Sequence, residues 1–392
     1  MARIESVDLF YLAMPEVEDV GDGSQDALVV RVVAGGEVGW GECEAAPLPS
    51  IASLVAPMSH SACHPVQASV LGERLDGVAD IARIAARVRA RSLDLLQADH
   101  TLSGIEMALW DLLGRRLSEP AWKLLGHARS EPRTPYASVL FGDDAQATLR
   151  KAQAIRAQGF RAAKFGWGPF GAGALAADED QLHAAREGLG PDGLLLIDAG
   201  TVWVADVAAA EARLPALEEA GAVWLEEPFV SGALDAYAAL ARKCRTVRLA
   251  GGEGSHNAWM GRGMVDHGGV GFVQIDAGRI GGLGPAKELA DHAAAKGVAY
   301  VNHTFTSQLA LAASLQPYAS HAAGSLCEYP LEAKPVAAAI AVERLDRGAD
   351  GLIRLPGGPG LGMTVEPERF RPWLVDVEIR VGGRTLYRTP AL

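Results

Sequence analysis

The sequence predicts an α/β protein built around a (β/α)7β barrel, a modified TIM barrel, with a separate α+β unit in front of it. Three observations support this fold class. The chain has 392 residues, more than a single hydrophobic core usually accommodates. Its middle part alternates eight short apolar segments with alanine-rich segments of helical periodicity. Its first part follows a different pattern, in which apolar and polar residues alternate.

We expect the α+β unit to cover residues 1–130. Alternating apolar and polar residues predict extended regions within 3–14 and 26–47, and the acidic, glycine-containing loop between them favours an antiparallel start. Apolar residues at helical spacing then predict helices within 79–96 and 103–126.

We expect the barrel to cover residues 131–330. Alternating strands and helices predict a parallel sheet, and eight such units predict a closed barrel whose active site lies at the carboxyl ends of the strands. No convincing helix follows the eighth strand, and residues 331–392 contain loops and strands that we expect to return to the first unit. The predicted strands cover residues 136–141, 161–166, 193–199, 222–228, 247–253, 271–277, 298–302 and 325–330.

Charge and composition exclude several classes of partner. The net charge of −12 argues against nucleic acid or an anionic membrane as a partner. The N-terminus carries acidic residues where a signal peptide needs basic and then apolar ones, and no run of 18 apolar residues occurs, so we expect a cytoplasmic protein. The four cysteines lie far apart and form no CxxC pair, which indicates reduced thiols rather than a disulfide framework or a zinc site.

Acidic residues end three consecutive predicted strands of the barrel. Asp198 ends the third strand, Glu226 the fourth and Glu253 the fifth, at separations of 28 and 27 residues. Three carboxylates on neighbouring strand ends would converge on one rim, and their mutual repulsion calls for a cation. Hard oxygen ligands of this kind suit Mg²⁺, which also accepts oxygens from water and substrate. Separate helix caps and salt bridges are the alternative interpretation.

An acid and an imidazole end the next two strands. Asp276 and His303 are 27 residues apart, and neighbouring strands would place the carboxylate beside the ring, where it orients the ring and raises its basicity. A buried histidine with a purely structural role is the alternative. Glu227, next to Glu226, would point away from the rim, so we expect it to support the site only indirectly.

Two further residues complete the predicted site. Glu328 ends the eighth strand and could hold a proton that it donates to a developing oxyanion, or form a structural salt bridge. Lys164 lies on the second strand, where its charge could balance an enolate, although a surface lysine is the simpler interpretation. Gly166 and Gly168 leave space nearby, and Trp167 either walls the pocket or only packs there.

Together these motifs resemble the enolase superfamily, specifically its mandelate racemase-like group. The resemblance covers nearly the whole chain and rests on "SGIEMALWDLLGR", "LLIDAG", "WLEEP", "GGE", "IDAGRIGG", "NHTF" and "PGLGMTV". It implies that the α+β unit and the C-terminal tail form a capping domain. Two loops of that domain, around residues 14–27 and 43–60, would exclude water and select the substrate.

The resemblance also implies the chemistry of the site. One Mg²⁺ per subunit would bind Asp198, Glu226 and Glu253 together with the carboxylate of a small substrate. His303, supported by Asp276, would remove the proton α to that carboxylate, in the His-base and Mg²⁺ scheme already described for this superfamily. Glu328 would stabilise the enediolate. Related enzymes are usually homo-oligomers, and we expect the same here.

One departure from the family pattern guides the choice of reaction. Racemases of this group carry a second lysine two positions after the first, and here that position is Gly166. Racemisation needs proton exchange on both faces of the substrate, whereas dehydration needs one base. We therefore expect an acid sugar dehydratase that forms a 2-keto-3-deoxy acid, with Lys164 acting electrostatically or, if desolvated, as a base.

Other reactions and classes remain as alternatives. An epimerase, racemase or cycloisomerase of a hydroxy or sugar acid would use the same residues without loss of water. A muconate-type cycloisomerase fits less well, because its base lysine on the sixth strand has no match beside Asp276, only Arg279 three positions on. A Schiff-base aldolase would use Lys164 and need no metal, and a non-catalytic metal-binding scaffold would leave His303 without a purpose.

Overall fold

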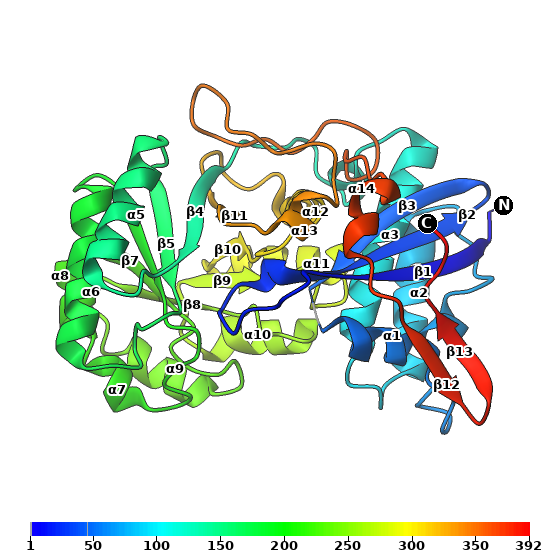
Figure 1. Ribbon diagram of the computed structural model, residues 1–392, viewed down its shortest axis with the longest axis horizontal. Coiled ribbons are helices and arrows are strands. Elements are labelled where there is room, and N and C mark those ends of the chain that lie inside the picture. The colour runs from blue at the N-terminus through cyan, green and yellow to red at the C-terminus, as the bar shows by residue number, and fades with distance from the viewer. Residues whose placement is uncertain (1, 45) are drawn as a thin grey trace.

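A computed structural model describes residues 2–44 and 46–392 of the chain. Its largest element is a sheet of eight parallel strands in the order β10-β9-β8-β7-β6-β5-β4-β11, which curls into a barrel (Figure 1). All eight predicted strands are present, so the predicted fold class is confirmed. They are β4 (Thr134–Leu140), β5 (Ala162–Gly166), β6 (Leu194–Asp198), β7 (Ala222–Glu226), β8 (Arg248–Gly251), β9 (Phe272–Ile275), β10 (Ala299–Asn302) and β11 (Leu326–Pro330).

One side chain bridges the gap between β10 and β11, the two strands at the ends of this sheet order. Asn302 of β10 accepts a hydrogen bond from the backbone N–H of Glu328 of β11 at 3.0 Å and another from the Tyr318 hydroxyl at 2.8 Å. The register also aligns the strand ends, because Gly166 pairs with Asp198 and Asp198 pairs with Glu226. Polar residues of several strands therefore meet at one mouth of the barrel.

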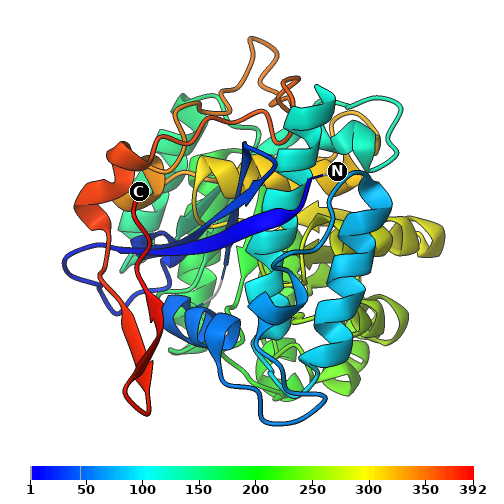
Figure 2. The ribbon, with the colours of Figure 1, turned by 90° about the vertical axis from the view of Figure 1, so that its right-hand side faces the viewer.

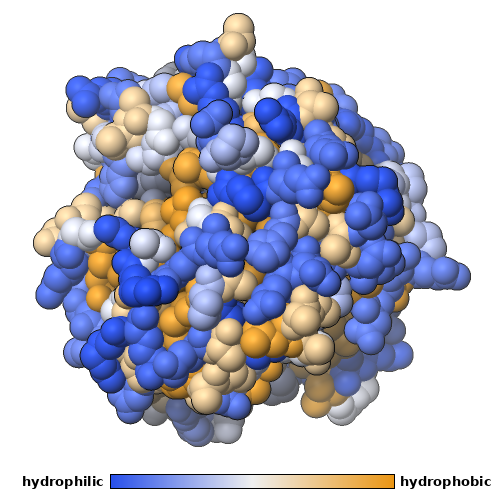
Figure 3. All heavy atoms as spheres, turned by 90° about the vertical axis from the view of Figure 1, so that its left-hand side faces the viewer, coloured by the Kyte–Doolittle hydropathy of each residue, from blue (hydrophilic) through white to orange (hydrophobic). Residues whose placement is uncertain are grey.

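Helices cover the outside of the barrel between successive strands, as expected for βα units. The face formed by the α5–α8 side of the molecule is mainly hydrophilic, with hydrophobic side chains in small groups (Figure 3). The barrel helices are α5 (Ala145–Ala157), α6 (Leu175–Leu189), α7 (Val207–Glu211), α8 (Leu214–Glu219), α9 (Leu234–Ala241), α10 (Ala258–His267), α11 (Leu283–Lys296) and α12 (Gln308–Leu315), followed by the short η3 (Gln316–Tyr318). No described helix has the length and apolarity needed to cross a membrane.

The N-terminal unit, which we call the cap, combines an antiparallel sheet with helices. The strand β3 lies directly on helix α3, because a Cβ atom at Gly39 or Gly41 would come within 2.1 Å of a backbone carbonyl of that helix. Only glycine allows so close an approach. The cap contains β1 (Ile4–Ala13), η1 (Gly23–Gln25), β2 (Asp26–Ala34), β3 (Glu37–Cys43), α1 (Pro47–Val55), η2 (Val66–Ser69), α2 (Val78–Arg91), α3 (Ala98–Leu117) and α4 (Ala121–Leu124).

The C-terminal tail returns to the cap, as predicted from the sequence (Figure 2). The backbone N–H of Val375 donates to the carbonyl of Tyr11 at 2.8 Å, and the Tyr387 hydroxyl donates to the carbonyl of Leu9. Phe370 packs its ring 6.0 Å from that of Phe10. The tail includes α13 (Pro335–Ala338), α14 (Pro367–Phe370), η4 (Arg371–Trp373), β12 (Glu378–Val381) and β13 (Arg384–Arg388).

Two buried carboxylates of α3 join the cap to the rest of the chain. Glu106 accepts hydrogen bonds from the backbone N–H groups of Leu283 (2.6 Å) and Gly284 (2.9 Å), the first residues of α11. A carboxylate at a helix N-terminus is favoured by the unpaired N–H groups there. Asp111 accepts from the backbone N–H groups of Trp40 (3.0 Å) and Leu361 (2.8 Å), so it links β3 to the tail.

Candidate active site at the barrel mouth

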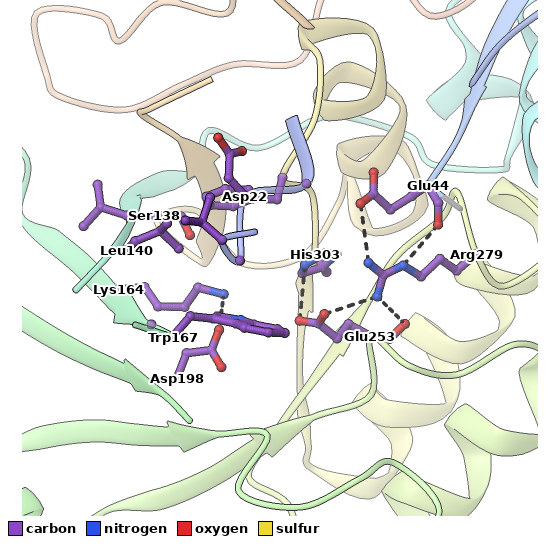
Figure 4. A pocket seen from close by; sticks show the side chains of 16 residues that line it. Asp22, Glu44, Ser138, Leu140, Lys164, Trp167, Asp198, Glu253, Arg279 and His303 are labelled. Atoms are coloured by element: carbon purple, nitrogen blue, oxygen red, sulfur yellow. Dashed lines mark hydrogen bonds and ion pairs between the residues drawn. The ribbon is translucent and has the colours of Figure 1, made fainter. Parts of the chain in front are cut away.

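A cavity of about 300 Å³ lies between the carboxyl ends of the barrel strands and the cap. This is the position at which barrel enzymes carry their active sites. Figure 4 shows Lys164, Asp198 and Trp167 on one side of it and His303, Glu253, Arg279 and Glu44 on the other. The lining residues are Val20, Gly21, Asp22, Gly23, Glu44, Ser138, Val139, Leu140, Lys164, Gly166, Trp167, Asp198, Glu253, Arg279, His303 and Phe305.

Lys164 is buried among three carboxylates. Its Nζ atom lies 2.6 Å from Glu226 Oε1, 2.9 Å from Glu328 Oε1 and 3.2 Å from Asp198 Oδ2. Burial alone would lower the pKa of Lys164, but the attraction of these three acids outweighs it and holds the pKa well above its usual value. The lysine is therefore charged and belongs to the site, rather than to the solvent-exposed surface.

His303 and Asp276 form the predicted pair. His303 Nδ1 lies 2.7 Å from Asp276 Oδ2, and the other ring nitrogen, Nε2, lies 3.2 Å from Glu253 Oε2. Burial would lower the pKa of His303, but attraction to Glu253 and Glu328, with the hydrogen bond to Asp276, raises it to about 10. Because Asp276 accepts at Nδ1, Nε2 is the nitrogen that faces the cavity contents.

The remaining carboxylates of the rim repel one another. Burial raises the pKa of Glu226 to about 8, Lys164 opposes this shift, and Asp198 and Glu328 add to it. Burial likewise raises the pKa of Asp198. Lys164 opposes this increase, and the charge of Glu253 adds to it. The cluster therefore carries more negative charge than its burial tolerates.

Glu227 is closer to this cluster than the strand pattern predicts. It is buried, and burial together with the charges of Glu253 and Asp198 raises its pKa well above the usual value. Its backbone has φ of 40°, the left-handed region that non-glycine residues rarely adopt. This turn at the end of β7 directs its side chain toward Ser231, whose hydroxyl donates to Glu227 at 3.4 Å.

The three predicted metal ligands are gathered only in part. Within residues 2–44 and 46–392, no three acidic, histidine or cysteine side chains form a ready ligand set for one ion. Asp198 and Glu226 are paired with Lys164, and Glu253 is paired with His303 and with Arg279 at 3.2 Å, so side-chain cations hold the carboxylates apart.

The donor chemistry nevertheless fits a divalent cation. The three acids end neighbouring strands, supply hard oxygen donors and repel one another, which are the properties that favour Mg²⁺ binding. Ion binding would have to displace the Lys164 ammonium from Asp198 and Glu226.

Glu328 lies behind the cavity wall. It is fully buried and accepts hydrogen bonds from Ser138 Oγ at 2.8 Å and from the backbone N–H of Thr304 at 2.7 Å, besides its contact with Lys164. Three donors, one of them cationic, therefore engage its two carboxylate oxygens. The role of Glu328 as a hydrogen-bond donor to an oxyanion stays a prediction, and it would require Lys164 to move away.

The structure explains why position 166 carries glycine. A Cβ atom there would lie 2.9 Å from Asp198 Cβ and 3.0 Å from its Oδ2, so any side chain would press on Asp198. The neighbouring Trp167 lines the cavity with φ of 56°, and its ring lies against Gly21 of the cap and Gly200 of the barrel. Trp167 is therefore a wall of the cavity, and its strained backbone is typical of functional sites.

Comparison with known proteins identifies the family. A model described as enolase C-terminal domain-like matches residues 147–369, and the model for the N-terminal domain of mandelate racemase and muconate lactonizing enzyme matches residues 14–126. The chain belongs to the mandelate racemase-like group of the enolase superfamily.

Relatives in this group include cycloisomerases and dehydratases of sugar acids. D-galactarolactone cycloisomerase of Agrobacterium fabrum is 31% identical over 342 residues, or 84% of this chain and 86% of the relative. Arabinonate dehydratase of Saccharolobus solfataricus is 27% identical and covers 69% of this chain and 71% of its own. The crystal structure of a predicted mandelate racemase from Rhodobacter sphaeroides is 61% identical, covers 100% of both chains and superposes with a TM-score of 0.95.

Two residues of this superfamily site were not predicted as part of it. Arg279 donates from Nη1 to Glu253 Oε1 at 3.2 Å and from Nε to the backbone carbonyl of Glu44 at 3.2 Å. Glu44 comes from the cap, and its Oε1 lies 3.4 Å from Arg279 Nη2. Arg279 follows Asp276 by three positions, which was the only signal for it, whereas Glu44 enters the site through the packing of the cap on the barrel.

Proposed function

We propose that the chain is a Mg²⁺-dependent dehydratase of sugar acids, a hydro-lyase that forms 2-keto-3-deoxy acids. The observation that carries this proposal is the pair of His303 and Asp276, which faces Lys164 and Asp198 across a cavity of about 300 Å³. A base on one side and a cationic, carboxylate-rich wall on the other are what proton removal beside a carboxylate requires.

His303 acts as the base through Nε2. Its Nδ1–H donates to Asp276, which fixes the ring and leaves Nε2 directed into the cavity. Burial lowers the pKa of His303, and the attraction to Glu253 is the largest of the effects that raise it to about 10. Neutralising the charge of Glu253 would therefore lower this pKa toward neutral pH, where a base is most effective. Nε2 then takes the proton from the carbon next to the substrate carboxylate.

Elimination follows from the presence of one clear base. The electron pair of the broken C–H bond forms the C2–C3 double bond, and the bond from C3 to its hydroxyl breaks. The protonated His303, or another acid, gives its proton to the departing hydroxyl, which leaves as water. The resulting enol takes up a proton at C3 and becomes the 2-keto-3-deoxy acid.

Asp198, Glu226 and Glu253 are the residues that would hold Mg²⁺. When bound, the ion would attract the substrate carboxylate and stabilise the negative charge that develops on it. A related structure from Paracoccus denitrificans was determined in complex with magnesium, which supports the choice of magnesium as the ion. Lys164, released from these acids, would face the substrate carboxylate, and Glu328 would remain its anchor within the barrel.

A substrate screen tests the proposal. Purified protein with Mg²⁺ would be incubated with aldonates, aldarates and uronates, and 2-keto acids would be detected with semicarbazide. We expect at least one sugar acid to yield a 2-keto acid, with activity lost in EDTA and recovered on return of Mg²⁺. Activity that survives EDTA and can be trapped by borohydride would instead support a Schiff-base reaction at Lys164.

A cycloisomerase is the second candidate. It is favoured by the 31% identity to D-galactarolactone cycloisomerase and the 30% identity to 3,6-anhydro-alpha-L-galactonate cycloisomerase of Streptomyces coelicolor. The same His303 and Asp276 would serve, but the product would have the mass of the substrate. Mass spectrometry therefore separates the two reactions, because dehydration removes one water.

A further inference from the structure

Every cationic side chain that lines the cavity is already engaged by carboxylates. Lys164 contacts three acids, His303 contacts Asp276 and Glu253, and Arg279 contacts Glu253 and Glu44. Among the described lining residues there is no other lysine, arginine or histidine. The proposed function places the substrate carboxylate at one end of the cavity, beside Asp198 and Lys164, where the metal ion would bind. We call this the metal end.

Arg279 is the cation nearest the cap, and each of its three guanidinium nitrogens has an acceptor. Nη1 donates to Glu253 Oε1 at 3.2 Å, Nε donates to the backbone carbonyl of Glu44 at 3.2 Å, and Nη2 lies 3.4 Å from Glu44 Oε1. Glu44 holds this contact whether it is ionised or neutral, because a carboxyl oxygen accepts in both states. The guanidinium is therefore already shared between Glu253 and Glu44, so a further anion would have to compete with these two acids for it.

The cap side of the cavity offers apolar contacts and hydrogen-bond acceptors. Val20 and Phe305 supply apolar surface, and Asp22 adds a buried carboxylate whose nearest lysine, Lys334, lies 3.9 Å away and outside the cavity lining. Glu44 Oε2 is buried and has no hydrogen-bond partner among the described residues. A substrate hydroxyl can donate a hydrogen bond to this oxygen, whereas an ionised carboxylate has no hydrogen to donate.

We propose that this cavity takes sugar acids with one carboxylate and an uncharged, hydroxylated tail, that is, aldonates rather than aldarates. The inference rests on the proposed function, because it assumes that the first carboxylate lies at the metal end. A second carboxylate at the cap end would lose its hydration beside Glu44 and Asp22, and the cation that lines this end, Arg279, is already paired with Glu253 and Glu44. Glu44, by keeping Arg279 engaged, is the residue that sets this selection.

Matched pairs of six-carbon acids test the inference. We would measure kcat/KM for galactonate against galactarate and for gluconate against glucarate, in the same Mg²⁺ buffer. Each pair differs only at C6, which is a neutral alcohol in the aldonate and a carboxylate in the aldarate. We expect the aldonate of the preferred pair to be used about 100-fold better or more, the size of effect that an unpaired buried charge produces.

A pair of variants identifies the residue responsible. Glu44→Ala frees Arg279 Nη2 and opens space at the cap end, so we expect the aldonate-to-aldarate ratio to fall about 10-fold or more. Glu18→Ala is the matched control, because Glu18 is an acid of the other cap loop, pairs with Lys334 at 2.8 Å and does not line the cavity. A merely structural role of Glu44 would lower both rates and leave the ratio unchanged.

Binding measurements separate the failure of this inference from failure of the proposed function. His303→Asn, expected to bind without turnover, would be titrated with both acids by calorimetry in the presence of Mg²⁺. Equal or tighter binding of the aldarate, or turnover that favours it, overturns the inference and leaves the dehydratase proposal intact. If no sugar acid reacts, the dehydratase proposal is wrong. The inference about the cavity then still requires that the aldonate binds more tightly than the aldarate.

Discussion

The buried carboxylates at the cap junction and those at the barrel mouth are stabilised in different ways. Glu106 and Asp111 accept hydrogen bonds from backbone N–H groups, whose positions are fixed by the fold. Asp198 and Glu226 depend mainly on the ammonium group at the end of a flexible lysine, and Glu253 on Arg279 and His303. Fixed donors make the first set structural, whereas movable cations leave the second set able to exchange partners.

The largest expected effect is at the base. His303→Asn removes the group that accepts the α-proton, so we expect kcat to fall by at least about 10³-fold. Mg²⁺ affinity, measured by calorimetry, should change little, because His303 is not among the three proposed ligands. A variant that keeps substantial activity would show that another residue is the base.

Removing a carboxylate at the cap junction should reduce the stability of the fold without changing the residues of the active site. Asp111→Ala leaves the backbone N–H groups of Trp40 and Leu361 and the guanidinium of Arg115 without their acceptor. We expect the free energy of unfolding to fall by about 3 kcal/mol. Urea denaturation checks this value. A loss below about 1 kcal/mol would contradict the assignment of Asp111 as a structural link.

Added Mg²⁺ should stabilise the barrel mouth by binding the folded state. At 100 times its dissociation constant the ion is expected to add about 2.7 kcal/mol to the free energy of unfolding. Glu226→Gln should abolish this increment, whereas Asp111→Ala should retain it on a lower baseline. Melting temperatures with and without Mg²⁺ test both statements, and an increment that survives Glu226→Gln would remove Glu226 from the ligand set.

Glu42 is another buried carboxylate of the cap, and its titration should make the free energy of unfolding depend on pH. Its Oε2 accepts from Ser307 at the junction, its Oε1 has no partner among the described residues, and burial raises its pKa to about 7. Because the folded-state pKa exceeds the unfolded value, protonated Glu42 stabilises the fold at low pH. This contribution should decline by about 2 kcal/mol between pH 5 and pH 7.

Glu42→Gln is the test of that dependence. The amide resembles the protonated carboxyl but does not titrate, so the free energy of unfolding of the variant should vary less between pH 5 and pH 7 than that of the natural chain. Parallel curves for the two proteins would show that Glu42 is not the group responsible.

The sequence was sufficient for the fold because its signals are local. Apolar segments of five to seven residues, separated by helical periodicity, located all eight barrel strands from "YASVLF" to "SLCEYP". The return of the tail to the cap was also predicted, although its anchors at Tyr11 and Leu9 were not. The approach of β3 to α3 at Gly39 and Gly41 depends on contacts between distant segments, which no local pattern reports.

For the site, the sequence located the strand-end residues but not their partners. Asp276 and His303 meet as expected, since neighbouring parallel strands bring their ends together. The positions of Glu44 and Arg279 depend on how a cap loop packs on the barrel. The pairing of Lys164 with two proposed metal ligands was also not predicted, because charge balance in a buried cluster is set by three-dimensional distances.

Trp167 couples the two halves of the entrance. Its indole ring lies against both Gly21 and Gly200, where any side chain would collide with it, so a loop of the cap and a loop of the barrel contact the same aromatic ring. A movement of either loop would therefore change the surroundings of this one indole ring.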